Sequence, residues 1–410
     1  MFGLLSLAVD FVAANKTEKP SRSALSVLFS VVFLDNLGFA IVLPYLFFYV
    51  TALGGSAFLY GILLASYSLL SFIFTPLVSR FSDRYGRRRI LLVALAVSSL
   101  SYFVFGSSHV LWLLFVGRML AGTTAATVPV AQAYVADVTS KEDRLRYLGL
   151  LGAAAGIAFI MGPAIGGTLS YLYGYGVPSF LASALALGNL IFAYFRLPEP
   201  AVFRDPEKTV ISCAALVDVL KKRQMVMLLG IFFMFFVSFV FLQAALSPWL
   251  QQVFGYGSLQ VGLVFFLVGG VSVFTQAVLL PFLSKKRNRL TLTIYSLGIF
   301  VVGLFALAFV QNLAFLFAAV VLISFGFGVL YITLNTLISL NAPTEAQGGT
   351  LGIAWAIAGL AQTVAPVLAA SVFTFGVSAG FSGLVFVVSA LIVIVTVPMV
   401  LNLRKTYKEQ

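Results

Sequence analysis

Long apolar segments alternate with short polar ones along almost the whole chain. A helix needs about 20 residues to cross a hydrocarbon layer about 30 Å thick, and each apolar segment is close to that length. We therefore predict an all-α membrane protein with twelve transmembrane helices. The expected spans are 24–50, 58–80, 88–106, 111–135, 146–172, 178–197, 225–250, 259–282, 291–309, 313–338, 349–372 and 381–402.

The connection between the sixth and seventh spans is longer and more polar than the others. It contains Pro198, Pro200 and Pro206 and the basic run at 221–223, a composition typical of a linker. This linker divides the chain into two six-helix bundles. The predicted parts are an N-terminal segment 1–23, an N-terminal bundle 24–197, the linker 198–224, a C-terminal bundle 225–402 and a tail 403–410.

The two halves are weakly repeated. A shift of 203 residues superimposes several small residues and a proline in register: Gly149 on Gly352, Gly156 on Gly359 and Pro163 on Pro366. Duplicated bundles are a common construction of secondary transporters, in which the substrate site lies between the halves near the membrane midplane. The repeat thus favours two pseudo-symmetric bundles.

The basic residues indicate the orientation of the chain in the membrane. All but one of its 25 Lys and Arg residues fall in every second gap between spans, and the intervening gaps contain none. Because cytoplasmic loops retain positive charge, we expect both termini in the cytoplasm, in a protein of the cell (plasma) membrane. These loops also account for the net charge of +12, so we expect contact with anionic membrane lipids and no nucleic acid.

The composition excludes several other classes of protein. With 61% hydrophobic and 9% charged residues, the chain cannot be a water-soluble globule. The single cysteine, Cys213, and the single histidine, His109, cannot form a disulfide framework or a metal cluster. We expect no cofactor, no metal and no enzymatic activity, and we expect a monomer.

The most specific motif is the run from Ser79 to Leu91, Ser-Arg-Phe-Ser-Asp-Arg-Tyr-Gly-Arg-Arg-Arg-Ile-Leu, placed in the loop after span two. It resembles the loop 2–3 signature of the major facilitator superfamily, Gly-x-Leu-Ala-Asp-Arg-x-Gly-Arg-Arg, with Ser79 in place of the first glycine. The glycine permits a tight turn, and the acid can pair with a cation or cap a helix of the opposing bundle. We expect the matching residues to form a cytoplasmic gate: Asp83, Arg84, Gly86, Arg87 and Arg88.

Two further segments strengthen this resemblance. Span one contains Leu-Asp-Asn-Leu-Gly-Phe at 34–39, followed by Leu43-Pro44, and is similar to tetracycline/proton antiporters. Span five resembles the Gly-x-x-x-x-x-Gly-Pro-x-x-Gly-Gly signature of the drug/proton antiporter branch. Because small residues let helices approach closely, we expect span five to lie at the bundle interface. The residues concerned are Gly156, Gly162, Pro163, Gly166 and Gly167.

Two charged residues lie deep inside spans, where a charge costs at least about 2.5 kcal/mol. Asp35 is about 17 Å from the inner start of span one, and Arg118 in span four reaches a similar depth from the opposite side. An ion pair would relieve both penalties. We therefore select Asp35 and Arg118 as the candidate proton-coupling residues.

The spans of the second half offer amides, hydroxyls and aromatic rings but no charge. A cavity with one protonatable acid and many aromatic rings suits a lipophilic or weakly cationic solute. The candidate cavity residues are Asn36, Gln243, Tyr331, Asn335, Trp355 and Gln362.

The favoured function is that of a secondary active transporter, which exports a small hydrophobic or amphipathic, drug-like compound by proton-coupled alternating access. Alternatives with the same fold are a lipid flippase or a metabolite exporter. A non-transporting membrane receptor or scaffold is the alternative from another class, and it would show no substrate flux.

Overall fold

Helices dominate the secondary structure of residues 22–200, 221–285, 287–342 and 347–406, the part that the computed structural model describes. Within it, twelve helices are long and apolar enough to cross a membrane, and no strand occurs. The predicted all-α, twelve-span fold is therefore confirmed. Most of the N-terminal segment, the linker residues 201–220 with Cys213, and the last four residues of the tail lie outside the described residues.

The helices have the following bounds. Those of residues 22–200 are α2 (Arg22–Val42), α3 (Leu46–Ala52), α4 (Ala57–Tyr85), α5 (Arg87–Gly106), α6 (Leu111–Thr123), α7 (Thr127–Val138), α8 (Lys141–Tyr173) and α9 (Gly176–Arg196). Those of the second half are α11 (Arg223–Phe254), α12 (Ser258–Phe274), a π-helical turn (Thr275–Leu279), α13 (Leu280–Ser284), α14 (Arg289–Ala308), α15 (Leu313–Asn341), α16 (Gln347–Ser378), α17 (Leu384–Ile394) and α18 (Val397–Thr406).

Three of the expected spans are interrupted by residues that are not helical. Span one breaks into α2 and α3 around Pro44, which has no N–H to donate and disfavours helical geometry in the residue before it. Span four breaks into α6 and α7 at residues 124–126, just before Pro129. There the Thr124 hydroxyl donates to the carbonyl of Ala121 and so replaces part of the lost helical bonding. Span twelve breaks into α17 and α18 at residues 395–396, just before Pro398. Continuous helices were wrong at these three places.

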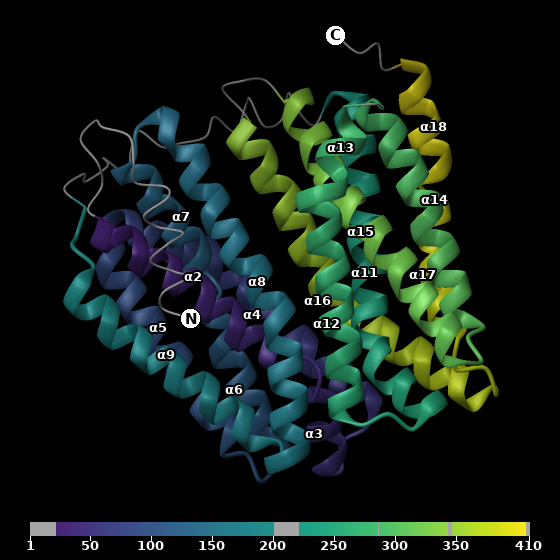
Figure 1. The fold of residues 1–410 in the computed structure, drawn as a ribbon, viewed down its shortest axis with the longest axis horizontal. Coiled ribbons are helices and arrows are strands. Elements are labelled where there is room, and N and C mark those ends of the chain that lie inside the picture. The colour runs from purple at the N-terminus through teal and green to yellow at the C-terminus, as the bar shows by residue number, and fades with distance from the viewer. Residues whose placement is uncertain (1–21, 201–220, 286, 343–346, 407–410) are drawn as a thin grey trace.

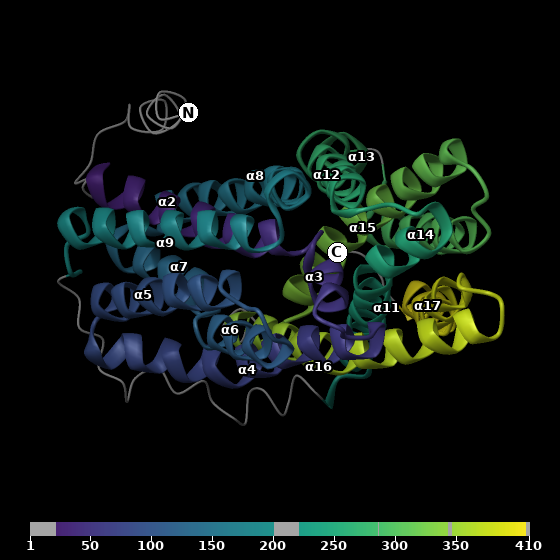
Figure 2. The same ribbon diagram turned by 90° about the horizontal axis from the view of Figure 1, so that it is seen from below.

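The helices form two bundles, α2–α9 and α11–α18, which lie side by side (Figures 1 and 2). We call the end with the turn at Gly86 and the segment 197–200 the basic end. The opposite end, where α3 lies, is called the neutral end, because its loops carry no Lys or Arg. We propose the two bundles as the domains of the chain, with the boundaries predicted above.

Two crossings of helices join the bundles, and they are equivalent. A Cβ atom added at Gly262 of α12 would lie 2.5 Å from the carbonyl oxygen of Pro163 in α8. A Cβ atom added at Gly61 of α4 would lie 2.7 Å from the carbonyl oxygen of Pro366 in α16. Pro163 and Pro366 are the prolines that the shift of 203 residues superimposes. The sequence repeat therefore corresponds to two matching contacts between the halves.

These crossings are close toward the neutral end and open toward the basic end. A Cβ atom added at Gly156, midway along α8, would lie 3.4 Å from the side chain of Val273 in α12. A Cβ atom added at Gly149, nearer the basic end of α8, would have no atom within 4 Å. Gly352, near the basic end of α16, would likewise have nothing within 4 Å. The helices of the two halves diverge toward this end (Figure 1). The conformation is thus one whose halves touch near the neutral end.

Candidate functional site

Arg118 is buried in α6, with 3% of its surface exposed. Its guanidinium carbon lies 4.3 Å from the ring centroid of Tyr67 in α4 and 5.2 Å from that of Phe39 in α2. Its Nε atom is buried without a hydrogen-bond partner. Cation–π contacts reach about 2 kcal/mol when the cation is desolvated. The two rings therefore compensate part of the cost of holding this charge inside the protein.

Asp35 lies in α2, one helical turn before Phe39, and its side chain is half-buried. The structure places no ion pair between Asp35 and Arg118, both of which it describes. The neighbouring Asn36, a candidate cavity residue, donates its amide to the carbonyl of Val32 in its own helix. The two charged residues therefore share a region of the N-terminal bundle, but the arginine is held by rings and not by the carboxyl group.

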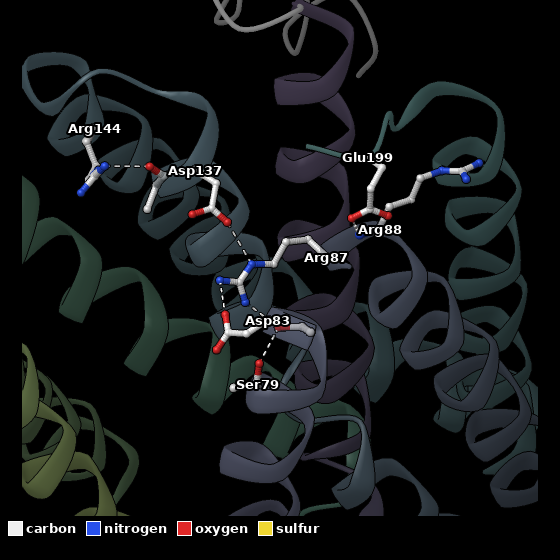
Figure 3. A network of polar contacts seen from close by, with 9 residues as sticks. Ser79, Asp83, Arg87, Arg88, Asp137, Arg144 and Glu199 are labelled. Carbon is white, nitrogen blue, oxygen red and sulfur yellow. Dashed lines mark hydrogen bonds and ion pairs between the residues drawn. The ribbon is translucent and has the colours of Figure 1, made fainter. Parts of the chain in front are cut away.

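Three of the gate residues, Asp83, Arg87 and Arg88, take part in polar contacts at the basic end (Figure 3). Arg87, the first residue of α5, is buried and pairs with Asp83 of α4. Its Nε atom lies 3.0 Å from Oδ2 of Asp137, at the end of α7, and the same guanidinium donates to the hydroxyl of Ser82. The network thus ties together the ends of three helices of one bundle.

The gate motif is mostly helical, although the sequence placed it in a loop. Residues 79–85 form the last turns of α4, Gly86 is the turn, and Arg87 begins α5. No Gly or Pro interrupts residues 79–85, and the φ of Gly86, 103°, lies in the region that favours glycine. The tight turn expected at Gly86 is present, but the loop is reduced to that residue.

Glu199 is a member of this network that sequence reasoning missed. Its carboxylate accepts a hydrogen bond from the backbone N–H of Arg88, in the first turn of α5, where a negative charge is favourable. A Cβ atom added at Gly86 would lie 2.7 Å from Glu199 Oε1. The Arg88 guanidinium donates to the carbonyl of Tyr194, while Arg84 lies over the Tyr85 ring. Glu199 stands between Pro198 and Pro200, and the sequence analysis therefore assigned it to the linker.

The small residues of α8 face two different partners. Gly162 and Gly166 pack closely on α2 within the same bundle, at Ala40 and Ile41. Gly167, in contrast, would place a Cβ atom 2.5 Å from the Ser258 carbonyl of α12. Pro163 and Gly156 contact the same helix, as described above. Three residues of the predicted set, Gly156, Pro163 and Gly167, therefore contact the other bundle through α12.

The candidate cavity residues of the second half are only partly brought together. Tyr331 of α15 and Trp355 of α16 lie with ring centroids 6.0 Å apart, and Trp355 is 43% exposed. Gln243 and Gln362 are half-buried, and Asn335 donates to the carbonyl of Tyr331 in its own helix. Sequence reasoning missed the phenylalanines that extend this cluster through ring contacts: Phe232, Phe235, Phe236, Phe239 and Phe327.

Replacing Asp83 with asparagine should favour the conformation that is open at the basic end. Asp137 and Ser82 still hold Arg87 in this conformation, so we expect the N-terminal bundle to remain folded. If Asp83 latches the basic end in the opposite conformation, a loss of about 1.4 kcal/mol shifts the ratio of conformations about tenfold. The measurement is the labelling rate of a cysteine at Gly352, in a Cys213→Ser background.

The matched control is Lys286→Gln, which changes the position equivalent to Asp83 in the second half and lies outside the described residues. We expect it to leave the labelling rate unchanged. An unchanged rate in Asp83→Asn, or an equal increase in both variants, would show that Asp83 is a solvated acid without a latching role.

The sequence is similar to those of known efflux proteins over most of its length. It is 29% identical to the class C tetracycline resistance protein of Escherichia coli, over 92% of this chain and 96% of that protein. It is 30% identical to the class D tetracycline resistance protein of Salmonella ordonez, over 77% and 80%. Multidrug resistance protein 1 of Bacillus subtilis is 27% identical over 87% and 91%.

The fold agrees with solved transporter structures. A bacterial homolog to the human lysosomal transporter Spinster, in an inward-facing and occupied conformation, aligns with a TM-score of 0.80 at 15% identity, over 95% of this chain and 98% of that one. The D-xylose–proton symporter aligns with a TM-score of 0.73 at 16% identity, over 92% and 96%. The family model of the Major Facilitator Superfamily matches residues 28–366. The resemblance seen in the motifs is thereby confirmed, and the chain belongs to the Major Facilitator Superfamily.

Proposed function

We propose that this transporter exports drug-like, amphipathic compounds across the plasma membrane in exchange for protons. The basic end faces the cytoplasm, and the two bundles rock about a site at mid-membrane depth. The observation that carries the proposal is the half-buried carboxyl group of Asp35, one helical turn before Phe39, whose ring contacts the guanidinium of Arg118. An acid inside a membrane span that lacks an ion pair is a candidate proton carrier.

The coupling follows from the energies of the two protonation states of Asp35. A neutral carboxyl group can lie at this depth without an ion pair, whereas a carboxylate there is costly unless a cation approaches it. Proton binding therefore changes the relative energies of the conformations that expose Asp35 to one side or the other. A ligand that favours one conformation shifts the population toward it, and here the proton acts as that ligand.

The substrate class is supported by the C-terminal bundle and by the relatives. The aromatic cluster around Trp355 offers ring faces and edges to an apolar or aromatic solute. The relatives are named for resistance to tetracycline and to multiple drugs. They favour drug efflux over lipid flipping or metabolite export. We also propose that the protein works as a monomer and that its basic loops contact anionic lipids.

The test is transport by the purified protein in liposomes with an acidic lumen. We expect tetracycline or the lipophilic cation ethidium to accumulate in the lumen against its gradient, beyond the level in protein-free liposomes. A protonophore should abolish the excess. If neither probe accumulates, drug export is contradicted. If accumulation survives the protonophore, proton coupling is contradicted. A receptor or scaffold would give no flux under any gradient.

A further inference from the structure

Two tyrosines lie near both candidate coupling residues. Tyr67 of α4 and Tyr102 of α5 are each close enough to both Asp35 and Arg118 to interact with them electrostatically. Tyr102 also fills the space beside α2, where a Cβ atom added at Gly38 would lie 2.8 Å from its hydroxyl oxygen. Aromatic side chains therefore adjoin both Asp35 and Arg118, and Tyr67 presents its face to the guanidinium.

The rings that hold Arg118 continue to the contact between the bundles. The Phe39 ring lies 5.3 Å from the Tyr67 ring and 6.0 Å, edge to face, from the ring of Phe159 in α8. At Phe159 the backbone itself contacts the other bundle, since a Cβ atom added at Gly269 of α12 would lie 3.0 Å from the Phe159 carbonyl oxygen. A continuous set of packed groups thus leads from the buried charge to the crossing of α8 and α12.

We propose that Tyr67 is a positioning residue for Arg118: with Phe39 it forms a resting place that competes with Asp35 for the guanidinium, and Phe39 transmits the outcome to the α8–α12 crossing. This inference rests on the proposed proton-coupled transport. While Asp35 is neutral, nothing draws Arg118 away from the rings. When Asp35 is ionised, the carboxylate attracts the guanidinium, which leaves Phe39 free to move against Phe159.

Asp35 is the carboxyl group of this region, and the other titratable groups near Arg118 are phenols. The titratable groups near Arg118 on the neighbouring segments are the phenols of Tyr45, Tyr60, Tyr67 and Tyr102, and phenols ordinarily titrate near pH 10. The helices α7, α8 and α9 also pack against α2, but their described titratable residues lie in or next to the terminal turns. Removing the Tyr67 ring therefore leaves Phe39 alone to compete with Asp35 for Arg118.

The test compares Tyr67→Leu with Tyr67→Phe in liposomes, with gradient-driven tetracycline uptake measured as a function of pH. Tyr67→Leu frees Arg118 to approach Asp35, which stabilises the ionised carboxyl group. The pH profile of uptake should therefore move toward lower pH by about one unit, which corresponds to the free energy of one cation–π contact. Tyr67→Phe keeps the ring and should keep the wild-type profile. Phe103→Leu removes a ring of α5 that packs on Phe180 and is 54% exposed, and it should also leave the profile unchanged.

Phe39→Leu provides a second variant should Tyr67→Leu fold poorly. It removes the other ring of the resting place and should move the profile in the same direction. A wild-type profile in a folded Tyr67→Leu or Phe39→Leu protein would overturn the inference, as would an equal shift in Tyr67→Phe. If the wild-type protein itself shows no gradient-driven uptake, the proposed function fails and this inference with it. A wild type that transports while the leucine variants keep its profile refutes the positioning role alone.

Discussion

Asp35→Asn should abolish accumulation of tetracycline against its gradient while exchange down the gradient continues. The amide has nearly the shape of a protonated carboxyl group but cannot release a proton, so the variant can bind substrate and change conformation without coupling the two gradients. Because an unpaired carboxylate inside the membrane is costly, the neutral amide should also leave the protein at least as stable to heat. The measurements are uphill and downhill flux in liposomes, with the melting temperature in detergent.

Asp143→Asn is the matched control. This acid lies at the start of α8, is exposed and is outside the deep part of any span. We expect both fluxes to remain at the wild-type level. Uphill accumulation that survives in Asp35→Asn would exclude Asp35 from proton coupling, whereas loss of both fluxes would assign it to substrate binding or folding.

Gly262→Ala should strongly reduce transport by separating the two bundles at their contact. The new Cβ atom would lie 2.5 Å from the Pro163 carbonyl oxygen and 3.0 Å from the Cα of Gly167. Both contacts are with backbone, which cannot rotate away, so α8 and α12 must move apart. Overpacking of this kind costs about 1–3 kcal/mol, which corresponds to about a 5- to 150-fold change between two conformations. We expect the shift to disfavour the conformation seen here.

The same helix provides the control for this variant. Gly270→Ala adds an identical methyl group to α12 at a position with nothing within 4 Å, and its transport should equal that of the wild type. The labelling rate of a cysteine at Gly352 should fall in Gly262→Ala and stay constant in Gly270→Ala. Equal labelling and equal transport in the two variants would mean that this crossing does not limit the conformational change.

The sequence alone was sufficient for the architecture because membrane insertion depends on properties that run along the chain. The length of each apolar segment predicted the twelve spans, and the register of Pro163 with Pro366 predicted two related halves. The gate motif identified the family, and it included Gly86, whose positive φ is a local property of one residue. Asp35 and Arg118 were found because charge is rare inside spans.

The partners of these residues were decided only by the tertiary structure. Depth along a span is one coordinate, and it placed Asp35 and Arg118 at the same level without saying which neighbours surround them. Helix packing set the faces of Tyr67 and Phe39 against the guanidinium, so the ion pair that depth alone favoured does not form.

Packing also decided the roles of residues whose sequence context was ambiguous. It brought Glu199, read as part of the linker, to the N-terminus of α5. It turned Gly162 toward α2 and Gly167 toward α12, although both belong to one motif. Hydropathy and spacing report how a helix lies in the membrane. The direction in which each side chain points, and what it meets, depend on the rotation of every helix against its neighbours, which only the folded bundles fix.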